Sequence, residues 1–141
     1  MTANISCTEL QVRYAETDQM GVAHHSNYII WCEQARTDHM RNLGVSYRGL
    51  EDQGIRLAVV DAHVRYRAPA RYDDLIRIRC WVRDVTSRRV VFGYALERGN
   101  DGHLLATAQT ALIAVDSQHA LTRIPPGVRD RMVIVPDPVR L

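Results

Sequence analysis

The sequence predicts an α+β fold in which one long central helix is wrapped by a curled antiparallel sheet of about five strands. One clear helical stretch, residues 27–43, lies in the first third of the chain. Several stretches with alternating apolar and polar residues follow it, and turn signals such as Asn100-Asp101-Gly102 separate them. Strands that are grouped after a helix, instead of alternating with helices, favour an antiparallel sheet in an α+β arrangement.

The expected helix has recognisable ends. Ser26 or Asn27 is a suitable N-cap, and Gly44 stands where the backbone commonly becomes left-handed after a helix. Residues 28–32 are apolar on every side, which predicts that the first turns are buried all round. Arg36 and the polar residues after it predict that the helix leaves the core toward its C-terminal end.

The strand expected first covers residues 9–14, and a short second helix is expected over residues 46–53. Four longer strands follow, over residues 57–67, 75–85, 90–98 and 103–115. Apolar and polar positions alternate in the second half of the first of these strands and along the second. In chain order these four strands predict a meander, with each strand paired to the next. A last helical turn over residues 127–132 and a loose tail over residues 136–141 complete the prediction.

The length of 141 residues suits one domain. We expect residues 1–141 to form a single unit with its core at about 8–117 and a C-terminal tail at 125–141. The net charge of +2 gives no reason to expect a nucleic-acid partner. All 18 basic residues are arginine, which reflects codon usage, the need for planar phosphate-binding groups, or both.

The cysteines, Cys7, Cys32 and Cys80, fit neither a disulfide framework nor a zinc site, because they are odd in number and widely spaced. Free thiols favour a reducing compartment. No apolar run approaches the length of a membrane span, and residues 1–8 lack the features of a signal peptide. We therefore expect a cytoplasmic protein without a membrane span.

One stretch carries a long and specific motif: residues 14–28 read YAETDQMGVAHHSNY. This motif resembles the signature of the 4-hydroxybenzoyl-CoA thioesterase family and is most similar to the branch that includes the thioesterases of the Tol-Pal gene cluster. The resemblance continues through residues 33–36 and resumes at residues 64–74, so that it covers about residues 8–117. It implies the hotdog fold, with the helix inside the curled sheet, and an acyl-CoA thioesterase that releases a free acid and coenzyme A.

The same resemblance implies roles for single residues. The aspartate that matches Asp18 is the catalytic carboxylate of the family, either as a nucleophile through a mixed anhydride or as a general base on water. The residue that matches His25 lies at the start of the helix, where a backbone N–H polarises the thioester carbonyl. Tyr14 matches a tyrosine that is also grouped with the active site. Gln19 and Met20 replace the small residues that many members carry, which leaves the shape of the acyl pocket open.

The residue types agree with these roles. Asp18 follows a strand and precedes a buried helix, so partial desolvation is expected to make its carboxylate more basic. The alternative is a turn or N-capping aspartate. Backbone amides at a helix N-terminus favour an oxyanion, and the residues expected to contact the substrate there, beside His25, are Ser26, Asn27 and Tyr28. His25 itself either orients the reacting groups or is a structural histidine.

Coenzyme A carries phosphates, which arginine binds well. The candidates are Arg88 and Arg89, before the third long strand; Arg65, Arg67 and Arg71 are alternatives, and any of these arginines can instead lie on a solvated face. The arginines that bind the phosphates can also come from a partner subunit. Because coenzyme A enters as part of the substrate, we expect no separate cofactor and no metal.

Glu33 is a second acidic candidate, because another type of hotdog thioesterase uses a glutamate on the helix. In this chain we expect it to pair with Arg36, three residues further on. The outer face of the sheet is expected to carry large and charged residues: Arg77, Arg79, Trp81 and Arg83. Hotdog sheets commonly associate through such faces or through their edges, so the resemblance implies a homodimer or a homotetramer.

Two other functions share this fold. A dehydratase or hydratase acting on acyl thioesters also uses an aspartate and a histidine, but the two lie closer together in that motif. A non-catalytic acyl-CoA-binding domain binds the thioester without turnover. The dehydratase motif also lacks the His-Ser-Asn-Tyr helix entry found at residues 25–28, and the presence of Asp18 argues against the binding domain. The sequence determines neither the acyl group nor whether the carrier is coenzyme A or acyl carrier protein.

Overall fold

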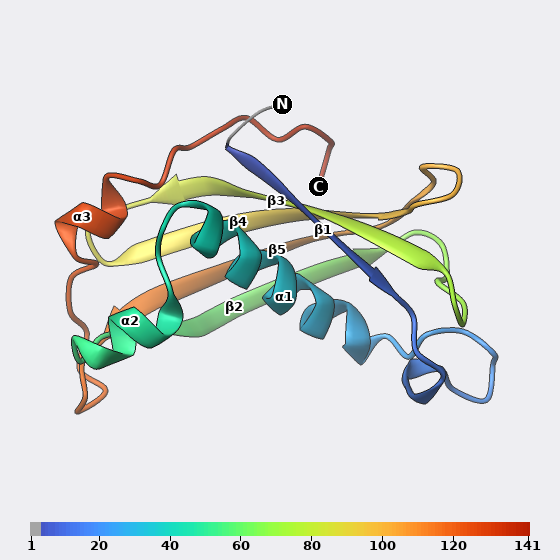
Figure 1. Cartoon of the computed structure of the whole chain (residues 1–141), viewed down its shortest axis with the longest axis horizontal. Coiled ribbons are helices and arrows are strands. Elements are labelled where there is room, and N and C mark those ends of the chain that lie inside the picture. The colour runs from blue at the N-terminus through green and yellow to red at the C-terminus, as the bar shows by residue number, and fades with distance from the viewer. Residues whose placement is uncertain (1–3) are drawn as a thin grey trace.

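The computed structural model describes residues 4–141. Its five strands form one antiparallel sheet in the order β1-β3-β4-β5-β2, and α1 lies across one face of this sheet (Figure 1). The elements in chain order are β1 (Ile5–Gln11), the 3-10 helix η1 (Tyr14–Glu16), α1 (Ser26–Asn42), α2 (Tyr47–Asp52), β2 (Arg56–Tyr66), β3 (Leu75–Val85), β4 (Arg89–Arg98), β5 (Leu104–Val115) and α3 (Pro126–Arg129). The predicted α+β fold, with one long helix against a curled antiparallel sheet, is confirmed.

The order of the strands differs from the predicted meander. β2 pairs with β5 at one edge of the sheet, while β1 pairs with β3, so the consecutive strands β2 and β3 are not neighbours. The connection between them, residues 67–74, passes the start of α1, where the Ala23 amide donates to the Ala70 carbonyl at 2.8 Å. The prediction was wrong because alternation shows which face a residue occupies but not which strand lies beside it.

β1 lies further toward the N-terminus than the strand predicted over residues 9–14. Its first residues face the helix with small polar side chains, which hid the apolar alternation. Ser6 Oγ lies 2.7 Å from Nδ1 of the buried His39, and the Thr8 hydroxyl donates to Asp38 at 2.7 Å. Hydrogen bonds therefore help to attach α1 to this edge strand.

α1 is buried along one stripe and not all round its first turns. Ile29 and Ile30 are 45% and 57% exposed, contrary to the prediction. The helix also does not leave the core toward its C-terminal end, where the buried residues include Arg36, His39 and Met40. The stripe continues at helical spacing through the polar Arg36 and His39 because their side chains find hydrogen-bond partners in the interior.

The tail predicted to be loose over residues 136–141 is fastened to the outer face of the sheet. Asp137 accepts hydrogen bonds from Trp81 Nε1 and from Arg83 Nε, each at 2.9 Å. The Val135 amide donates to a carbonyl of β3 at 3.2 Å. Trp81, which was expected on an open outer face, is fully buried.

The buried ring of Trp81 requires a residue without a side chain at Gly93. A Cβ at Gly93 would lie 2.6 Å from this ring, whereas a Cβ at Gly127 would meet nothing within 4 Å. We expect Gly93→Ala to lower the free energy of unfolding by about 1–3 kcal/mol, because the ring has to move within a packed layer. Gly127→Ala is the control and should change the free energy of unfolding by no more than about 1 kcal/mol. Urea unfolding measures both, and equal losses in the two variants would contradict the prediction.

Candidate active site

A tight loop between η1 and α1 presents Asp18. The Asp18 amide donates to the Val22 carbonyl (2.9 Å), and Gly21, with φ +78°, donates to the Asp18 carbonyl (3.0 Å). One carboxylate oxygen, Oδ1, accepts the Met20 amide at 2.9 Å. The other, Oδ2, has no hydrogen-bond partner within residues 4–141, and the residue is half-buried. Asp18 is thus a turn residue whose second carboxylate oxygen, Oδ2, is available to react.

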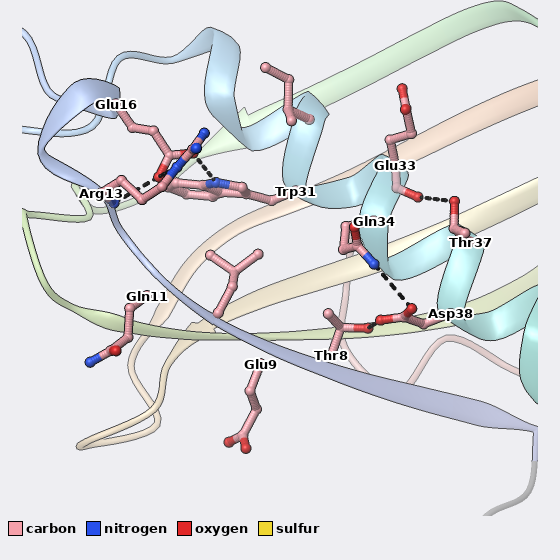
Figure 2. Close-up of a pocket in the computed structure, with 12 residues that line it drawn as sticks. Thr8, Glu9, Gln11, Arg13, Glu16, Trp31, Glu33, Gln34, Thr37 and Asp38 are labelled. Carbon is pink, nitrogen blue, oxygen red and sulfur yellow. Dashed lines mark hydrogen bonds and ion pairs between the residues drawn. The ribbon is translucent and has the colours of Figure 1, made fainter.

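Glu16 holds this loop against α1, although no sequence pattern pointed to it. Its side chain is 6% exposed and accepts hydrogen bonds from the Arg13 amide (2.8 Å) and from Trp31 Nε1 (2.9 Å), as Figure 2 shows. Its carbonyl accepts the His24 amide (2.8 Å) and the Asn27 side-chain amide (2.9 Å). Burial alone would raise the pKa of Glu16, but these side-chain hydrogen bonds outweigh it and hold the pKa below its ordinary value.

The first amides of α1 are nearly all satisfied. Ser26 N–H donates to His24 Nδ1 (3.3 Å), Asn27 N–H to the His24 carbonyl (3.0 Å), and Tyr28 N–H to the His25 carbonyl (3.3 Å). The prediction that Ser26 or Asn27 is the N-cap was wrong, because His25 occupies the N-cap position. The His25 side chain caps no amide within residues 4–141, and the His24 ring accepts the Ser26 amide. The His25 amide has no acceptor within residues 4–141. It is therefore an open donor at the positive end of the helix dipole.

A cavity of about 310 Å³ opens beside His25. Its lining residues come from the start of α1 and the end of β2: Ala23, His25, Tyr28, Tyr66, Arg67, Ala68 and Pro69. The Tyr66 hydroxyl donates to the His25 carbonyl (2.9 Å), and the two rings meet edge to face. The His25 ring is exposed and lies against that of His24, with the centroids 4.2 Å apart. A backbone donor, an imidazole and an arginine thus border one cavity.

Three residues predicted to contact the substrate have side chains engaged in local structure. Ser26 Oγ bonds to His24 Nδ1 (2.8 Å), and Asn27 Nδ2 donates to a carbonyl of η1 (2.9 Å). The buried Tyr28 hydroxyl accepts the Ala70 amide at 3.0 Å. These contacts fix the path of the chain on both sides of the open amide.

Two other predicted elements of the site are placed differently relative to the Asp18 loop. Tyr14 adjoins the loop, because its carbonyl accepts the amide and the hydroxyl of Thr17 at 3.1 and 2.7 Å, but its side chain is 77% exposed and packs edge-on against Tyr72, with no side-chain hydrogen bond within residues 4–141. Arg88 and Arg89 lie at the turn between β3 and β4, whereas the Asp18 loop follows β1 at the opposite end of β3. At about 3.3 Å per residue, the length of β3 separates the two ends by roughly 30 Å.

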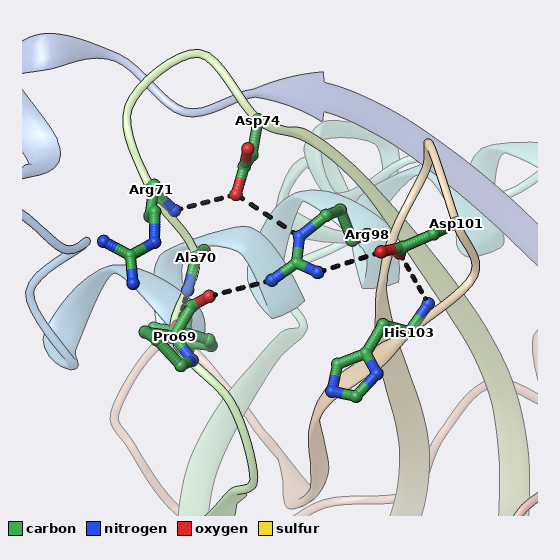
Figure 3. A network of polar contacts seen from close by, with 8 residues as sticks. Pro69, Ala70, Arg71, Asp74, Arg98, Asp101 and His103 are labelled. Carbon is green, nitrogen blue, oxygen red and sulfur yellow. Dashed lines mark hydrogen bonds and ion pairs between the residues drawn. The ribbon is translucent and has the colours of Figure 1, made fainter.

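The connection between β2 and β3 supports the cavity from outside. Ala70 accepts the Ala23 amide through its carbonyl and donates its own amide to Tyr28, so it holds the chain before and after His25. Figure 3 shows Arg98 on the far side of this connection. Arg98 donates to the carbonyl that precedes Ala70 (3.3 Å) and lies 3.6 Å from an oxygen of Asp74.

The ion pair predicted between Glu33 and Arg36 does not occur within residues 4–141. Arg36 is 7% exposed, and its Nε and Nη1 donate to the hydroxyls of Tyr47 (3.2 Å) and Tyr94 (3.3 Å). Glu33 lies on the exposed side of α1. Burial raises the pKa of Tyr47 to about 12, against the opposing effect of the guanidinium. The prediction failed because core packing, and not helical spacing, decides where the guanidinium points.

The chain can be compared with known proteins at this point. The family model described as the thioesterase-like superfamily matches residues 12–132. The chain belongs to the thioesterase-like superfamily. Among its relatives, the acyl-CoA thioester hydrolase YbgC of Escherichia coli O6:H1 is 30% identical over 107 residues, 76% of this chain and 79% of that protein. YneP of Bacillus subtilis, named provisionally as an acyl-CoA thioesterase, is 36% identical over 115 residues, 82% of this chain and 83% of that protein.

Among solved structures of this superfamily, the crystal structure of DHNA-CoA thioesterase from Staphylococcus aureus is similar with a TM-score of 0.82. It is 38% identical and covers 84% of this chain and 80% of its own. The predicted hotdog fold is confirmed, as is the enzyme class, acyl-CoA thioesterase. No helix within residues 4–141 is long and apolar enough to cross a membrane. In the same part of the chain, no three His, Cys, Asp or Glu side chains are placed to hold a metal ion.

Glu16 links pH to stability, because its pKa is lower in the folded protein than in the unfolded chain. Such a carboxylate stabilises the fold above its unfolded pKa of about 4.3, and this contribution is lost as pH falls through the folded pKa. We expect Glu16→Gln to lower the free energy of unfolding at neutral pH by about 1–3 kcal/mol. It should also flatten the loss of stability between about pH 5 and pH 3.

Urea unfolding across this pH range tests the prediction, with the exposed Glu51→Gln as the control. The control should keep both the stability and the pH dependence of the wild type. An unchanged pH dependence in Glu16→Gln would show that this carboxylate is not coupled to folding.

Proposed function

We propose that this chain hydrolyses acyl-CoA thioesters to a free acid and coenzyme A, with Asp18 as the catalytic carboxylate and the His25 amide as the oxyanion donor. One observation carries the proposal: a short segment leading into α1 holds two open groups, Asp18 Oδ2 and the His25 N–H, neither with a partner within residues 4–141. A carboxylate supplies the base or nucleophile of thioester cleavage, and an amide at a helix N-terminus stabilises developing negative charge. The likeness to the thioester hydrolase YbgC supports the same reaction.

In this mechanism the carbonyl oxygen of the thioester accepts the His25 amide, and the helix dipole adds to the stabilisation of the oxyanion. As a general base, Asp18 Oδ2 takes a proton from water while the water oxygen bonds to the carbonyl carbon. The C–S bond then breaks, and the thiolate leaves and takes up a proton. As a nucleophile, Oδ2 instead bonds to the carbonyl carbon and expels the thiolate, after which water cleaves the mixed anhydride.

The finer assignment is to the 4-hydroxybenzoyl-CoA thioesterase branch, near the thioesterases of the Tol-Pal cluster. The motif over residues 14–28 and the likeness to YbgC support it. Coenzyme A is the proposed carrier and enters as part of the substrate, so that the reaction requires no separate cofactor. The cytoplasmic location remains a prediction from the free cysteines.

We also propose that the active unit is a homodimer formed along β2. This edge strand of 11 residues has one side without a strand partner within residues 4–141, and Val59 and Val60 are half exposed on it. A long edge strand with exposed apolar residues is a template for pairing with a second copy. Antiparallel pairing of two β2 edges reverses one sheet end for end. It therefore brings the turn with Arg88 and Arg89 of one subunit toward the Asp18 end of the other.

Asp18→Asn tests the catalytic carboxylate, because it keeps the shape of the side chain and removes the base and nucleophile. We expect kcat to fall at least about 100-fold, a loss of about 3 kcal/mol of transition-state stabilisation. Thiol release from short, long and aromatic acyl-CoAs, followed with a thiol-reactive dye, measures this. Glu33→Gln is the control and should stay within about threefold of the wild type.

The outcomes separate the alternatives. Equal rates in wild type and Asp18→Asn would exclude Asp18 and direct attention to Glu33. Affinity for acyl-CoA without thiol release by the wild type would indicate a non-catalytic binding domain. Gain or loss of water by the acyl group, with the thioester intact, would indicate a hydratase or dehydratase.

A charge on the free edge of β2 tests the homodimer. We expect Val60→Asp to give a monomer by light scattering and to reduce thiol release at least about tenfold, because the shared site is then incomplete. Val133→Asp places the same charge on the exposed C-terminal segment and should leave both properties unchanged. A Val60→Asp protein that stays dimeric would place the interface elsewhere.

A further inference from the structure

The carbonyl of His24 belongs to the same peptide group as the open His25 amide, and Asn27 donates two hydrogen bonds to it. The Asn27 backbone amide donates to this oxygen at 3.0 Å, and the side-chain nitrogen, Nδ2, donates to it at 3.2 Å. A carbonyl oxygen has two lone pairs, so these two donors satisfy it fully. Asn27 therefore holds the peptide group of the oxyanion donor from its opposite end.

The side-chain amide of Asn27 has one orientation that its surroundings allow. The two N–H bonds of Nδ2 serve two carbonyls, those of Glu16 (2.9 Å) and His24 (3.2 Å). A rotated amide would place Oδ1 against the same two oxygens, and two acceptors cannot form a hydrogen bond. The half-buried side chain is thus a fixed double donor that joins the end of η1 to the start of α1.

Hydrogen bonds to a peptide oxygen strengthen the N–H of the same peptide group as a donor. Resonance moves electron density from the peptide nitrogen to the oxygen, and donors at the oxygen favour this shift. Because linked hydrogen bonds polarise one another, the effect on the His25 amide is largest when its acceptor carries negative charge. Asn27 can therefore stabilise an oxyanion without touching it.

The next peptide group along the chain also has donors on its oxygen but does not share this role. The His25 carbonyl accepts the Tyr66 hydroxyl (2.9 Å) and the Tyr28 amide (3.3 Å). The N–H of that peptide group belongs to Ser26 and already donates to the His24 ring at 3.3 Å. Polarisation of this second peptide group is therefore not passed to the open amide.

We infer that Asn27 is a positioning residue: its side-chain N–H, bound to the His24 carbonyl, orients and polarises the peptide group whose His25 amide binds the oxyanion. This inference rests on the proposed function, because it names a further residue of the same site. The hydrogen bond matters most in the transition state, where the thioester oxygen becomes negative, and little in the bound substrate. Its loss should therefore lower kcat and leave KM nearly unchanged.

Asn27→Ala and Asn27→Ser together test the inference, with thiol release from acyl-CoA as the assay. Both variants lose the hydrogen bond to the Glu16 carbonyl. A serine hydroxyl at this position, however, can donate to the carbonyl three residues earlier, which is that of His24. The pair therefore isolates the hydrogen bond to His24.

We expect Asn27→Ala to lower kcat about tenfold, less than the roughly 100-fold loss that follows removal of an oxyanion donor itself. Its KM should stay within about twofold of the wild type, and Asn27→Ser should keep kcat within about threefold. The exposed Asn100→Ala is the matched control and should keep both constants.

Equal losses of kcat in Asn27→Ala and Asn27→Ser would overturn the inference, because the Glu16 contact would then explain the effect. An unchanged kcat in Asn27→Ala, or a loss confined to KM, would overturn it as well. If circular dichroism shows that Asn27→Ala does not fold, the isosteric pair Asn27→Thr and Asn27→Val replaces it. A higher kcat with the hydroxyl supports the inference, and equal values overturn it.

Failure of the proposed function has a different signature, which is no thiol release from any thioester by the wild type. The His25 amide proton is then observed directly by NMR. Its resonance should lie further downfield in the wild type and Asn27→Ser than in Asn27→Ala, because a polarised N–H is less shielded. The same resonance position in all three proteins would overturn the inference.

Discussion

The buried carboxylate of Glu16 is the constraint on which the site depends. Its two oxygens hold the Arg13 amide and the Trp31 indole, and its carbonyl holds His24 and Asn27. One residue therefore joins the end of β1, the side of α1 and the start of the same helix. With these points fixed, the chain between them has little freedom except to form the tight loop that presents Asp18.

The second support comes from the opposite side of the site. Ala70 bonds to Ala23 and Tyr28, which lie before and after His25, and Arg98 holds the connection that carries Ala70. The distant Ala70 thus fixes the chain on both sides of the open His25 amide. An oxyanion donor acts through such fixed orientation, because it has no reorganisation to undergo when charge develops. The exposed His25 ring makes no hydrogen bond within residues 4–141, whereas the His25 carbonyl accepts the Tyr66 hydroxyl.

Part of the site was predictable because it is local. The motif over residues 14–28 indicated Asp18 and the start of the helix, and both the turn at Gly21 and the open His25 amide arise within that segment. Glu16 belongs to the same motif but was missed, since its partner Trp31 lies a helix turn and a half inside α1. The buried position of Trp31, whose indole N–H needs an acceptor, was the one signal that could have revealed it.

By itself, the sequence determined the long helix, the spans of β2 to β5 and the loop that carries Asp18, because hydrophobic period, turn residues and a contiguous motif act over short distances. Only the tertiary structure decided the strand order, the fastening of the tail by Asp137 and the burial of Arg36 among tyrosines. These features depend on pairings between segments far apart in the chain. Alternation in the sequence indicates which face of the sheet a side chain occupies. The hydrogen-bond partner of a buried polar group depends instead on which distant segment packs against it.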